Sequence, residues 1–424
     1  MISRSRKPLQ LLAVAVSFGA FLTAPALASA APTIKWSRSA SLVFPQAAYT
    51  LDTVACVPSV TSTASTGSSS AGTLVTNTSL LCLAGDTRGG IWASVHPGRG
   101  KVAWHRERVD TMLGGRAITG ISCPALNLCV AVDANGQVMH SVKPAVAAKD
   151  WSKPQRVDAA LQPGGGYVGF SAISCPSINL CVAVDNDPSG QVAYTTTPAG
   201  PASSWKVVSL GTSVTLDAVS CASVNLCVIG GSERFYSTKP TGGANSWTAI
   251  GTLAGSYSNI ASLSCAGPRL CLGVGYGDAG TGLSAGTSAI ASAGGTWTEA
   301  YVGTDPPAPG AGLVDSVACP FTNFCVAVDG ASNAYTTTTP VRGNWSAAKP
   351  LKPNSQATLS AVSCNQTVCV EVDNRGTATF GEITVGKASV KAGTGTSTTK
   401  SSTTATSKSS TTTTTKSSTT TAAA

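Results

Sequence analysis

The sequence predicts an all-β fold: a seven-bladed β-propeller of four-stranded antiparallel blades, closed by the N-terminal strand, with one disulfide per blade. Three observations predict it. A cysteine-containing unit recurs roughly every 50 residues, and a repeat of that length indicates an array of like units. Fourteen cysteines fall into seven sequential pairs, and a tryptophan follows six of them. Only 11% of the residues are charged, and Gly, Ser, Thr and Val are abundant, which is typical of strands and turns.

Residues 1–31 are expected to be an export signal. A basic start (residues 4–7) precedes an apolar run over 9–22 and a small-residue cleavage site at 28–30. An uncleaved membrane anchor is the alternative, although Pro25 interrupts the run. We expect no transmembrane segment after cleavage, because no other stretch is long and apolar enough. The protein is therefore expected to be secreted or extracellular.

Each repeat is expected to fold as four strands. In residues 171–212, SAISC is a short strand, PSINL a turn, and CVAVD an apolar run typical of a strand buried on both faces. A second turn over 185–190 leads to a third strand, QVAYTTT, and WKVVSL is a fourth strand that opens with Trp205. Four strands joined by short turns and repeated around a ring make a propeller blade.

The tryptophans indicate how the ring closes. One tryptophan opens each of six predicted fourth strands: Trp104, Trp151, Trp205, Trp247, Trp297 and Trp345. None follows the last cysteine pair, whereas Trp36 precedes the first. We therefore expect the N-terminal strand, residues 33–46, to complete the last blade and remove the free sheet edges. An open solenoid is the alternative, and it leaves Trp36 unexplained.

The cysteines predict a disulfide framework, since an exported chain with an even number of regularly spaced cysteines forms bridges. The simplest assignment pairs them within each repeat: Cys56 with Cys82, Cys123 with Cys129, Cys175 with Cys181, Cys221 with Cys227, Cys265 with Cys271, Cys319 with Cys325, and Cys364 with Cys369. Each short loop contributes about 2 kcal/mol. Metal ligation is the competing interpretation, but the three histidines do not recur with the repeat. We expect neither a metal nor another cofactor.

The net charge of +9 is carried by the ends of the chain. The signal and the tail hold eight of the 28 basic residues and no acid, which leaves the predicted propeller, residues 32–386, close to neutral. A nucleic-acid-binding protein should carry its positive charge on the fold itself. We therefore expect no nucleic-acid partner, and we expect a monomer.

The tail, residues 387–424, consists almost entirely of Ser, Thr and Lys. With no apolar side chains to bury, it is expected to be disordered. It is interpreted either as a cationic tether or stalk at an acidic cell envelope, with Ser and Thr open to glycosylation, or as a low-complexity extension without a role. Residues 61–73 have a similar composition and are expected to form a protruding loop in the first blade.

The order of a strand, a turn, an apolar strand ending in an acid or Gly, and a Thr-rich strand leading to Trp resembles the BNR (Asp-box) repeats. Over roughly residues 33–386 the chain is similar to the photosystem II assembly factor-like propellers, whose shape is shared by sialidases. The resemblance implies the blade fold. The chain departs from it where segments such as 195–205 and 237–247 place Pro or Lys-Pro in the turn before Trp, and the cysteine pairs are an addition.

The acids that close the second strands are candidate binding residues. They are expected to ring one face of the propeller, opposite the cysteine hairpins: Asp86, Asp133, Asp185, Asp329 and Asp373. Such a ring suits a cation or a basic partner. The alternative, which we favour, is that each Asp forms a turn with the Gly that follows it. Gly231 and Gly275 replace the acid in two blades and weaken the ring.

Two strings resemble catalytic motifs. Residues 282–286, GLSAG, match a hydrolase nucleophile elbow, and residues 275–280 match a dinucleotide fingerprint. Both motifs need a following helix, and here the first falls where a third strand is expected. In a chain with 44 glycines we interpret both matches as chance, and we assign no catalytic residue.

The leading functional hypothesis is an exported, non-catalytic binding or scaffolding propeller at the cell surface or envelope, with an unknown protein or envelope glycan as ligand. The alternative is a carbohydrate-active hydrolase of the sialidase or glycosidase kind on the same fold. The chain lacks the Arg-Ile-Pro start of sialidases, and its spacing assigns no arginine triad. Whichever holds, we expect the functional residues among those that differ between blades.

Overall fold

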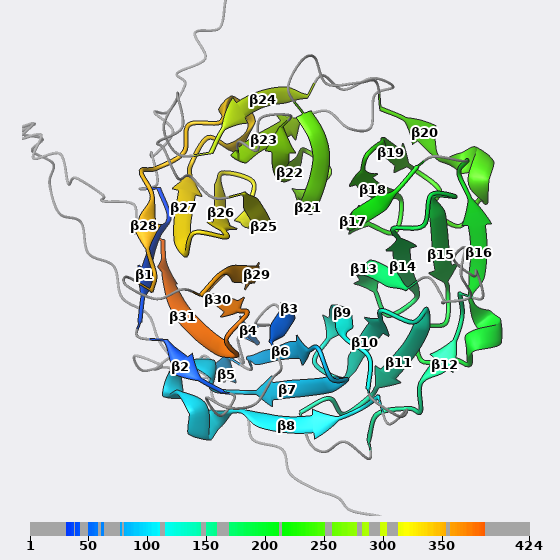
Figure 1. Ribbon diagram of the computed structural model, residues 1–424, viewed down its shortest axis with the longest axis horizontal. Helices are drawn as coiled ribbons and strands as arrows, with labels where there is room; N and C mark the ends of the chain where they lie inside the picture. The colour runs from blue at the N-terminus through cyan, green and yellow to red at the C-terminus, as the bar shows by residue number, and fades with distance from the viewer. Residues whose placement is uncertain are drawn as a thin grey trace, which may run out of the picture. The chain divides into compact units, whose positions relative to one another are not determined.

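The structure is a computed structural model that describes residues 31–37, 39–42, 50–57, 61–62, 77–78, 80–110, 115–145, 150–158, 169–211, 214–250, 257–277, 282–287, 297–302, 313–352 and 357–385. All of them belong to one compact unit, Ala28–Lys387. They form seven antiparallel sheets of four or more strands around a central axis (Figure 1). The predicted propeller is confirmed. The expected signal up to residue 30 and the tail from residue 387 lie outside the described residues.

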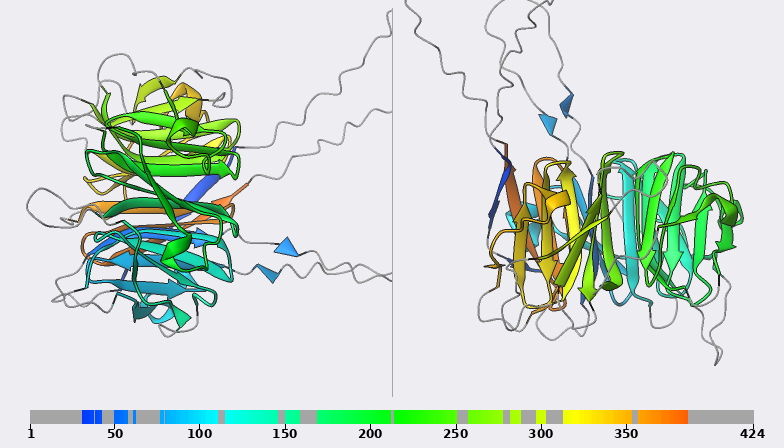
Figure 2. Two further views of the ribbon diagram at one scale, coloured as in Figure 1. Left: turned by 90° about the vertical axis from the view of Figure 1, so that its right-hand side faces the viewer. Right: turned by 90° about the horizontal axis from the view of Figure 1, so that it is seen from above.

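The first strand of each blade is the innermost. These strands follow one another around the axis, each in contact with the first strands of both neighbouring blades. In blade order they are β3 (Leu51–Val57), β9 (Ile118–Ala125), β13 (Phe170–Ser177), β17 (Leu216–Ser223), β21 (Tyr257–Gly267), β25 (Val314–Phe321) and β29 (Leu359–Cys364). Figure 2 shows the strands running between the two faces of the ring.

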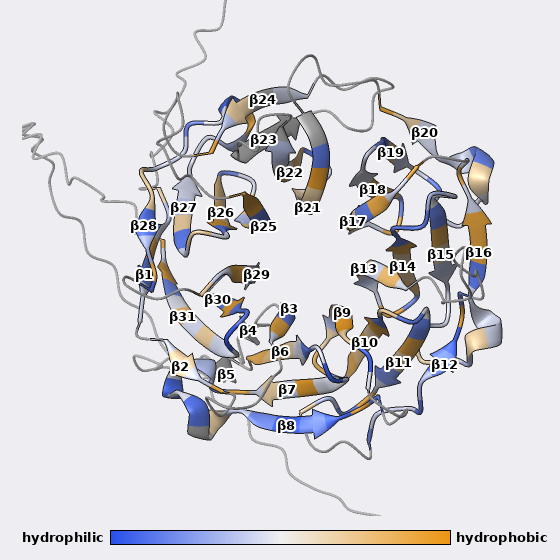
Figure 3. Ribbon diagram, in the orientation of Figure 1, coloured by the Kyte–Doolittle hydropathy of each residue, from blue (hydrophilic) through white to orange (hydrophobic). Residues whose placement is uncertain are grey.

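The second strand of each blade forms the blade core, as the CVAVD runs predict. These strands are β6 (Leu81–Asp86), β10 (Leu128–Asp133), β14 (Leu180–Asp185), β18 (Leu226–Gly231), β22 (Leu270–Gly277), β26 (Phe324–Asp329) and β30 (Val368–Asp373). Every residue of β10, and likewise of β14, is buried. Figure 3 shows these two strands as apolar and the outermost strand of the first blade as hydrophilic.

The third strands lie outside the second. They are β7 (Gly90–Ser94), β11 (Gln137–Ser141), β15 (Gln191–Thr195), β19 (Arg234–Ser237), β23 (Gly282–Thr287), β27 (Asn333–Thr337) and β31 (Thr377–Thr384). The GLSAG string lies wholly within β23, as expected, and β23 pairs on both sides as a strand. A nucleophile elbow would need a strand-to-helix turn there.

The fourth strands are short. They are β8 (His105–Arg108), β12 (Gln155–Arg156), β16 (Lys206–Ser209), β20 (Thr248–Ala249), β24 (Thr298–Tyr301) and β28 (Lys349–Pro350) in the first six blades. Short 3₁₀ helices precede four of them: η1 (Pro97–Arg99) with η2 (Lys101–Ala103), η4 (Ala202–Ser204), η5 (Ala244–Ser246) and η6 (Pro340–Arg342). The tryptophan that follows each helix is buried, and so are Trp151 and Trp297.

The N-terminal segment closes the ring, as predicted. Two strands, β1 (Thr33–Trp36) and β2 (Ala40–Ser41), pair with β31 and give the last blade its outer edge. Residues 43–46 of the predicted strand lie outside the described part of the chain. Leu42, just after β2, is fully buried in the apolar core between the last and first blades. The closure is thus held by backbone pairing and by a core side chain.

A common register explains why Trp36 takes the missing place. In the third blade, Cys181 lies opposite Thr195 on the third strand, and Trp205 precedes Lys206, the partner of Tyr194. In the last blade, Cys369 lies opposite Gly381, and Gly381 lies opposite Trp36. Trp36 therefore sits where the other blades carry their tryptophan. A Cβ on Gly381 would come within 2.8 Å of the Trp36 ring, so glycine is required there.

All seven predicted disulfides are present, one in each blade. Each joins the first strand to the second at directly opposed or adjacent positions, with Cα atoms 3.9 to 4.1 Å apart. The bridge in the first blade spans 26 residues because of the Ser/Thr-rich insertion. From that insertion the structure describes β4 (Thr61–Ser62) paired with β5 (Asn77–Thr78); residues 63–73 of the predicted loop lie outside the described residues.

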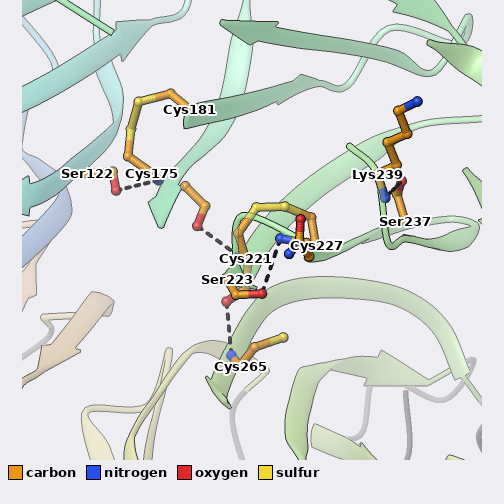
Figure 4. Close-up of a disulfide and its surroundings, with 12 residues drawn as sticks. Ser122, Cys175, Cys181, Cys221, Ser223, Cys227, Ser237, Lys239 and Cys265 are labelled. Carbon is orange, nitrogen blue, oxygen red and sulfur yellow. Dashed lines mark hydrogen bonds between the residues drawn. A yellow bond between two sulfur atoms is a disulfide. The ribbon is translucent and has the colours of Figure 1, made fainter. Parts of the chain in front are cut away.

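In five of the seven blades a serine precedes the first cysteine and connects the blade to the next. Its Oγ accepts a hydrogen bond from the backbone N–H of the next blade's first cysteine at 2.9 to 3.0 Å, as in Ser122 to Cys175 and Ser174 to Cys221. Ser363 and Cys56 make this contact across the closure. Figure 4 shows the Ser122–Cys175 bond beside the Cys221–Cys227 disulfide. The Ser-Cys dipeptide of the repeat is therefore an inter-blade contact as well as a bridge.

The two faces of the ring are built from different connections. The hairpins that carry the cysteines and the connections from third to fourth strands form one face, called here the cysteine-hairpin face. The turns from second to third strands and the connections between blades form the other, called here the acid-turn face. The apolar cores between them combine residues of neighbouring blades, such as Val130 with Ala183.

Candidate functional site at the mouth of the central channel

The five acids predicted to ring one face lie on the acid-turn face, but their side chains are fully buried. Each folds back into its own turn. The Asp133 carboxylate accepts the backbone N–H groups of Asn135 and Gln137 at 2.9 Å, and Asp86, Asp185, Asp329 and Asp373 do the same in their blades. The five acids therefore do not form an acidic ring that is exposed to solvent. These residues form turns, as the favoured alternative predicted, because two amide donors hold each carboxylate inside.

The second carboxylate oxygen of these acids differs from blade to blade. In Asp86 it accepts from Arg106 and from the Trp92 indole, and in Asp329 it accepts from Tyr335 at 2.7 Å. In Asp133 it is buried and accepts no hydrogen bond, and burial raises the pKa of this carboxyl to about 6. The repeated turn thus has blade-specific surroundings, although none of these carboxylates is open to solvent.

A bulge near the start of each first strand inserts one extra residue at the acid-turn end of the innermost strands. In β3 the register against β6 jumps from Leu51 to Thr53, which leaves Asp52 as an extra residue. The corresponding extra residues of the later blades are Thr119, Ser171, Asp217, Ala261, Asp315 and Ser360. Three blades thus have an acid at this position and four have a small residue.

Two of the bulge residues are used to join blades. The Thr119 hydroxyl donates to the Phe170 carbonyl of the next blade at 2.6 Å, and Ser171 donates to Leu216 in the same way at 2.7 Å. The acids at the same position do not take this role. The Asp217 carboxylate instead accepts from the Asn259 amide, which also donates to Tyr276.

Asp52, Asp315 and Ser360 line one open cavity of about 670 Å³ on the acid-turn face. They come from the first, sixth and last blades, so the cavity extends over the ring closure. Thr358 adds a hydroxyl, and the remaining lining consists of Leu, Gly and Ala. No basic residue is among the described residues that line it. We identify this mouth pocket as the candidate functional site.

Burial governs the electrostatics of the mouth pocket. It raises the pKa of Asp315 to about 7, and the nearby charge of Asp329 adds to the effect. Burial also raises the pKa of Asp52, with a hydrogen bond from the Thr50 hydroxyl at 2.9 Å working against it. Near neutral pH the Asp315 carboxyl can therefore donate as well as accept a hydrogen bond. The two carboxyls suit a ligand with cationic or hydroxyl groups.

Asp52 and Asp315 were not predicted from the sequence, although a signal for them exists. Aligned on the first cysteine, LDTVAC, LDAVSC and VDSVAC place Asp four residues before it, where other repeats have Thr, Ser or Ala. The column varies among otherwise similar repeats, and we expected functional residues to vary in this way. The bulge that turns this column toward the mouth becomes evident only from the strand register.

The structure describes no group of three His, Cys, Asp or Glu side chains that could hold a metal ion. None of the helices in the described part of the chain is long and apolar enough to span a membrane. Seven disulfides indicate an oxidising, extracytoplasmic compartment.

Solved structures share the fold at low sequence identity. The chain is similar to the RRP9 WD40 repeats, with a TM-score of 0.58 and 10% identity over 84% of this chain and 100% of that one. It is also similar to YCF48 from Cyanidioschyzon merolae, with a TM-score of 0.53 and 13% identity over 81% and 98%. No family model and no curated protein matches the chain. The comparisons therefore support the β-propeller part of the expected resemblance and establish no function.

Proposed function

We propose that this protein is a non-catalytic binding or scaffolding propeller that works outside the cytoplasm and holds its ligand in the mouth pocket. The observation that carries the proposal is the bulge position, which brings Asp52, Asp315 and Ser360 from three blades to one cavity. In a repeat protein, residues at a shared position serve the repeat, and those that vary there are free to serve a ligand.

The chemistry of the mouth pocket favours a ligand rich in cationic or hydroxyl groups, from a partner protein or an envelope glycan. The two carboxyls supply directional hydrogen bonds, and small residues such as Gly330 and Ala331 leave the cavity open. The central mouth is a common place for propellers to bind, which is an analogy at the level of the fold.

The test is a binding screen of the purified protein against envelope glycans and basic peptides, followed by two variants. Asp315→Asn should weaken the binding of a ligand found in this screen by about tenfold, since it replaces an ionisable hydrogen-bonding group in the pocket. Asp217→Asn is the matched control, because Asp217 has the same bulge position but does not line the cavity. Equal effects of the two variants would overturn the assignment of the site.

A glycoside hydrolase is the second candidate, favoured by the presence of two carboxyls in one pocket. Such enzymes need an acid and a base whose pKa values are pushed apart, whereas those of Asp52 and Asp315 are both raised. The part of the pocket lining that the structure describes also contains no arginine of the kind that sialidases use. Turnover of a panel of aryl glycosides that is abolished by Asp315→Asn would establish the hydrolase and reject the non-catalytic proposal.

Attachment to the cell envelope is part of the proposal. The tail supplies five lysines and no acid over residues 387–424, which suits an acidic envelope. A chain ending at residue 386 keeps all strands of the propeller, since β31 ends at Thr384. We expect this shortened chain to be released into the medium, measured by cell fractionation. If it stays with the envelope as the full chain does, the tail is not the tether.

A further inference from the structure

The cysteine-hairpin face has a second cavity, of about 300 Å³, at the outer rim of the first blade. It lies where β7 ends and β8 begins, against Ala145 of the second blade. Its polar lining consists of Ser94, His96, Arg99 and His105, and the rest is Ala and Val. None of the described residues that line it carries a carboxylate. The cavity is on the opposite face from the mouth pocket, so it is a separate site.

Local geometry holds the cationic groups around this rim pocket. Ser94 is buried and its Oγ accepts the His96 N–H at 3.0 Å, which starts the turn into η1. Pro97 is buried at the first position of η1, and the Arg99 N–H donates to the His96 carbonyl at 3.0 Å. Gly98 packs against the Phe380 ring of the last blade. The backbone is thus fixed, while His96, Arg99 and His105 remain exposed.

The surrounding face is cationic. Exposed basic residues occur on its hairpins and connections in five of the blades: Arg99, Lys101, Lys143, Lys239, Arg269 and Arg342. Among the described residues of these hairpins and connections, the one acid is Asp150, which is half-buried. Although the propeller as a whole is close to neutral, this face is positively charged. It should therefore attract anions from a distance.

We propose that the rim pocket binds an acidic sugar unit of an anionic polysaccharide, and that the surrounding cations guide the chain to it. The Arg99 guanidinium can engage a carboxylate or sulfate through two hydrogen bonds, and the imidazoles of His96 and His105 add donors. The cavity volume matches the small end of ligand pockets and the size of one sugar ring. The alanine and valine side chains give the ring an apolar surface to lie on.

The experiment uses the full chain and four probes: an oligogalacturonate for carboxylates, a heparin oligosaccharide for sulfates, a dextran oligomer as the neutral glycan, and a DNA hairpin. Calorimetry should detect one or both anionic glycans and not dextran, with binding that weakens as salt rises. The glycan that binds more tightly shows whether carboxylate or sulfate is recognised. DNA binding as tight as the better glycan would overturn the assignment to a polysaccharide.

Two variants separate the pocket from diffuse charge. Arg99→Ala should weaken the binding of the tighter-binding anionic glycan about tenfold, whereas Arg342→Ala should weaken that binding no more than about twofold. Arg342 is the matched control because it ends η6 as Arg99 ends η1, is exposed on the same face, and does not line the pocket. Unchanged melting temperatures would show that both variants fold. Equal losses for the two, or no binding of either anionic glycan, would overturn the proposal.

Discussion

At two blade junctions, side chains of opposite charge occupy equivalent positions beside a buried turn acid. At the junction of the second and third blades, Asp158 follows the last strand of one blade and meets the turn acid Asp185 of the next. At the junction of the sixth and last blades, Lys352 has the same place and meets the turn acid Asp373. Backbone bonds mark the equivalence, since Val157 donates to Gly136 and Leu351 to Ser332 in the same way.

The junction of the second and third blades holds two carboxyl groups and no cation between them. Both side chains are buried. Burial, followed by the neighbouring Asp158, raises the pKa of Asp185 to about 8. The junction therefore avoids two buried negative charges side by side when Asp185 carries a proton.

The junction of the sixth and last blades holds a buried cation between two acids. Lys352 contacts Glu371 at 3.1 Å as well as Asp373, and both acids are fully buried. Burial raises the pKa of Glu371 to about 7 even though the charge of Lys352 acts to lower it. Glu371 occupies a place in β30 where β10 and β14 have alanine. This junction depends on charge balance.

The comparison shows that one backbone arrangement accepts either a second acid or a lysine beside the turn acid. The first junction contains no cation, so its stability should depend on the proton of Asp185 and therefore on pH. The raised pKa of Glu371 gives the second junction a pH dependence as well, but only the second junction should respond to mutation of its cation.

Removing the cation should have the largest effect. Lys352→Met leaves Glu371 and Asp373 buried without their counter-charge, and breaking a buried ion pair in this way costs about 3–5 kcal/mol. The free energy of unfolding from urea titration measures it. Lys349→Met, at an exposed lysine of β28, is the control and should change stability by less than about 0.5 kcal/mol. A loss below about 1 kcal/mol for Lys352→Met would contradict the ion-pair description.

Removing one acid should change the pH dependence of stability. The folded chain keeps a proton on Asp185 that the unfolded chain releases, so wild-type stability falls as pH rises from about 4 to about 8. Asp158→Asn removes the neighbouring acid that raises this pKa, so it should flatten the fall and gain about 1–2 kcal/mol at pH 9, with little change at pH 5. Melting temperatures from pH 5 to pH 9 measure it, with Asp150→Asn on the other face as control. Parallel curves for wild type and variant would show that Asp158 does not raise the pKa of Asp185.

The smallest effect concerns the inner end of the same two junctions. Ser122 accepts the Cys175 N–H between the second and third blades, whereas Ala318 has the serine's place in the sixth blade. Ser122→Ala should therefore cost about 1 kcal/mol, the net value of one such hydrogen bond. Ser223→Ala, which removes an exposed bond within one turn, should cost less. If the two costs are equal, the inter-blade serine bond adds nothing to the junction.

Most of the fold could be predicted from the sequence because the same pattern occurs in all seven repeats. The cysteine pairs, the buried second strands and the place of Trp36 follow from local spacing, and the structure confirms them. The acids that end the second strands form turns, as the favoured interpretation predicted, because an Asp that ends a buried strand can turn its carboxylate toward the amides of its own turn. Asp52 and Asp315 were missed because a bulge reverses the alternation that assigns side chains to a face.

The sequence by itself determined the blade, the bridge within it and the closure of the ring, since each depends on residues within one repeat or on a simple count of tryptophans. Only the tertiary structure decided which side chains meet between repeats, such as Asp158 with Asp185 and Lys352 with Glu371. The physical reason is that these contacts depend on how neighbouring blades pack. Strand register and ring closure bring together groups that belong to separate repeats, so no periodicity in the chain records them.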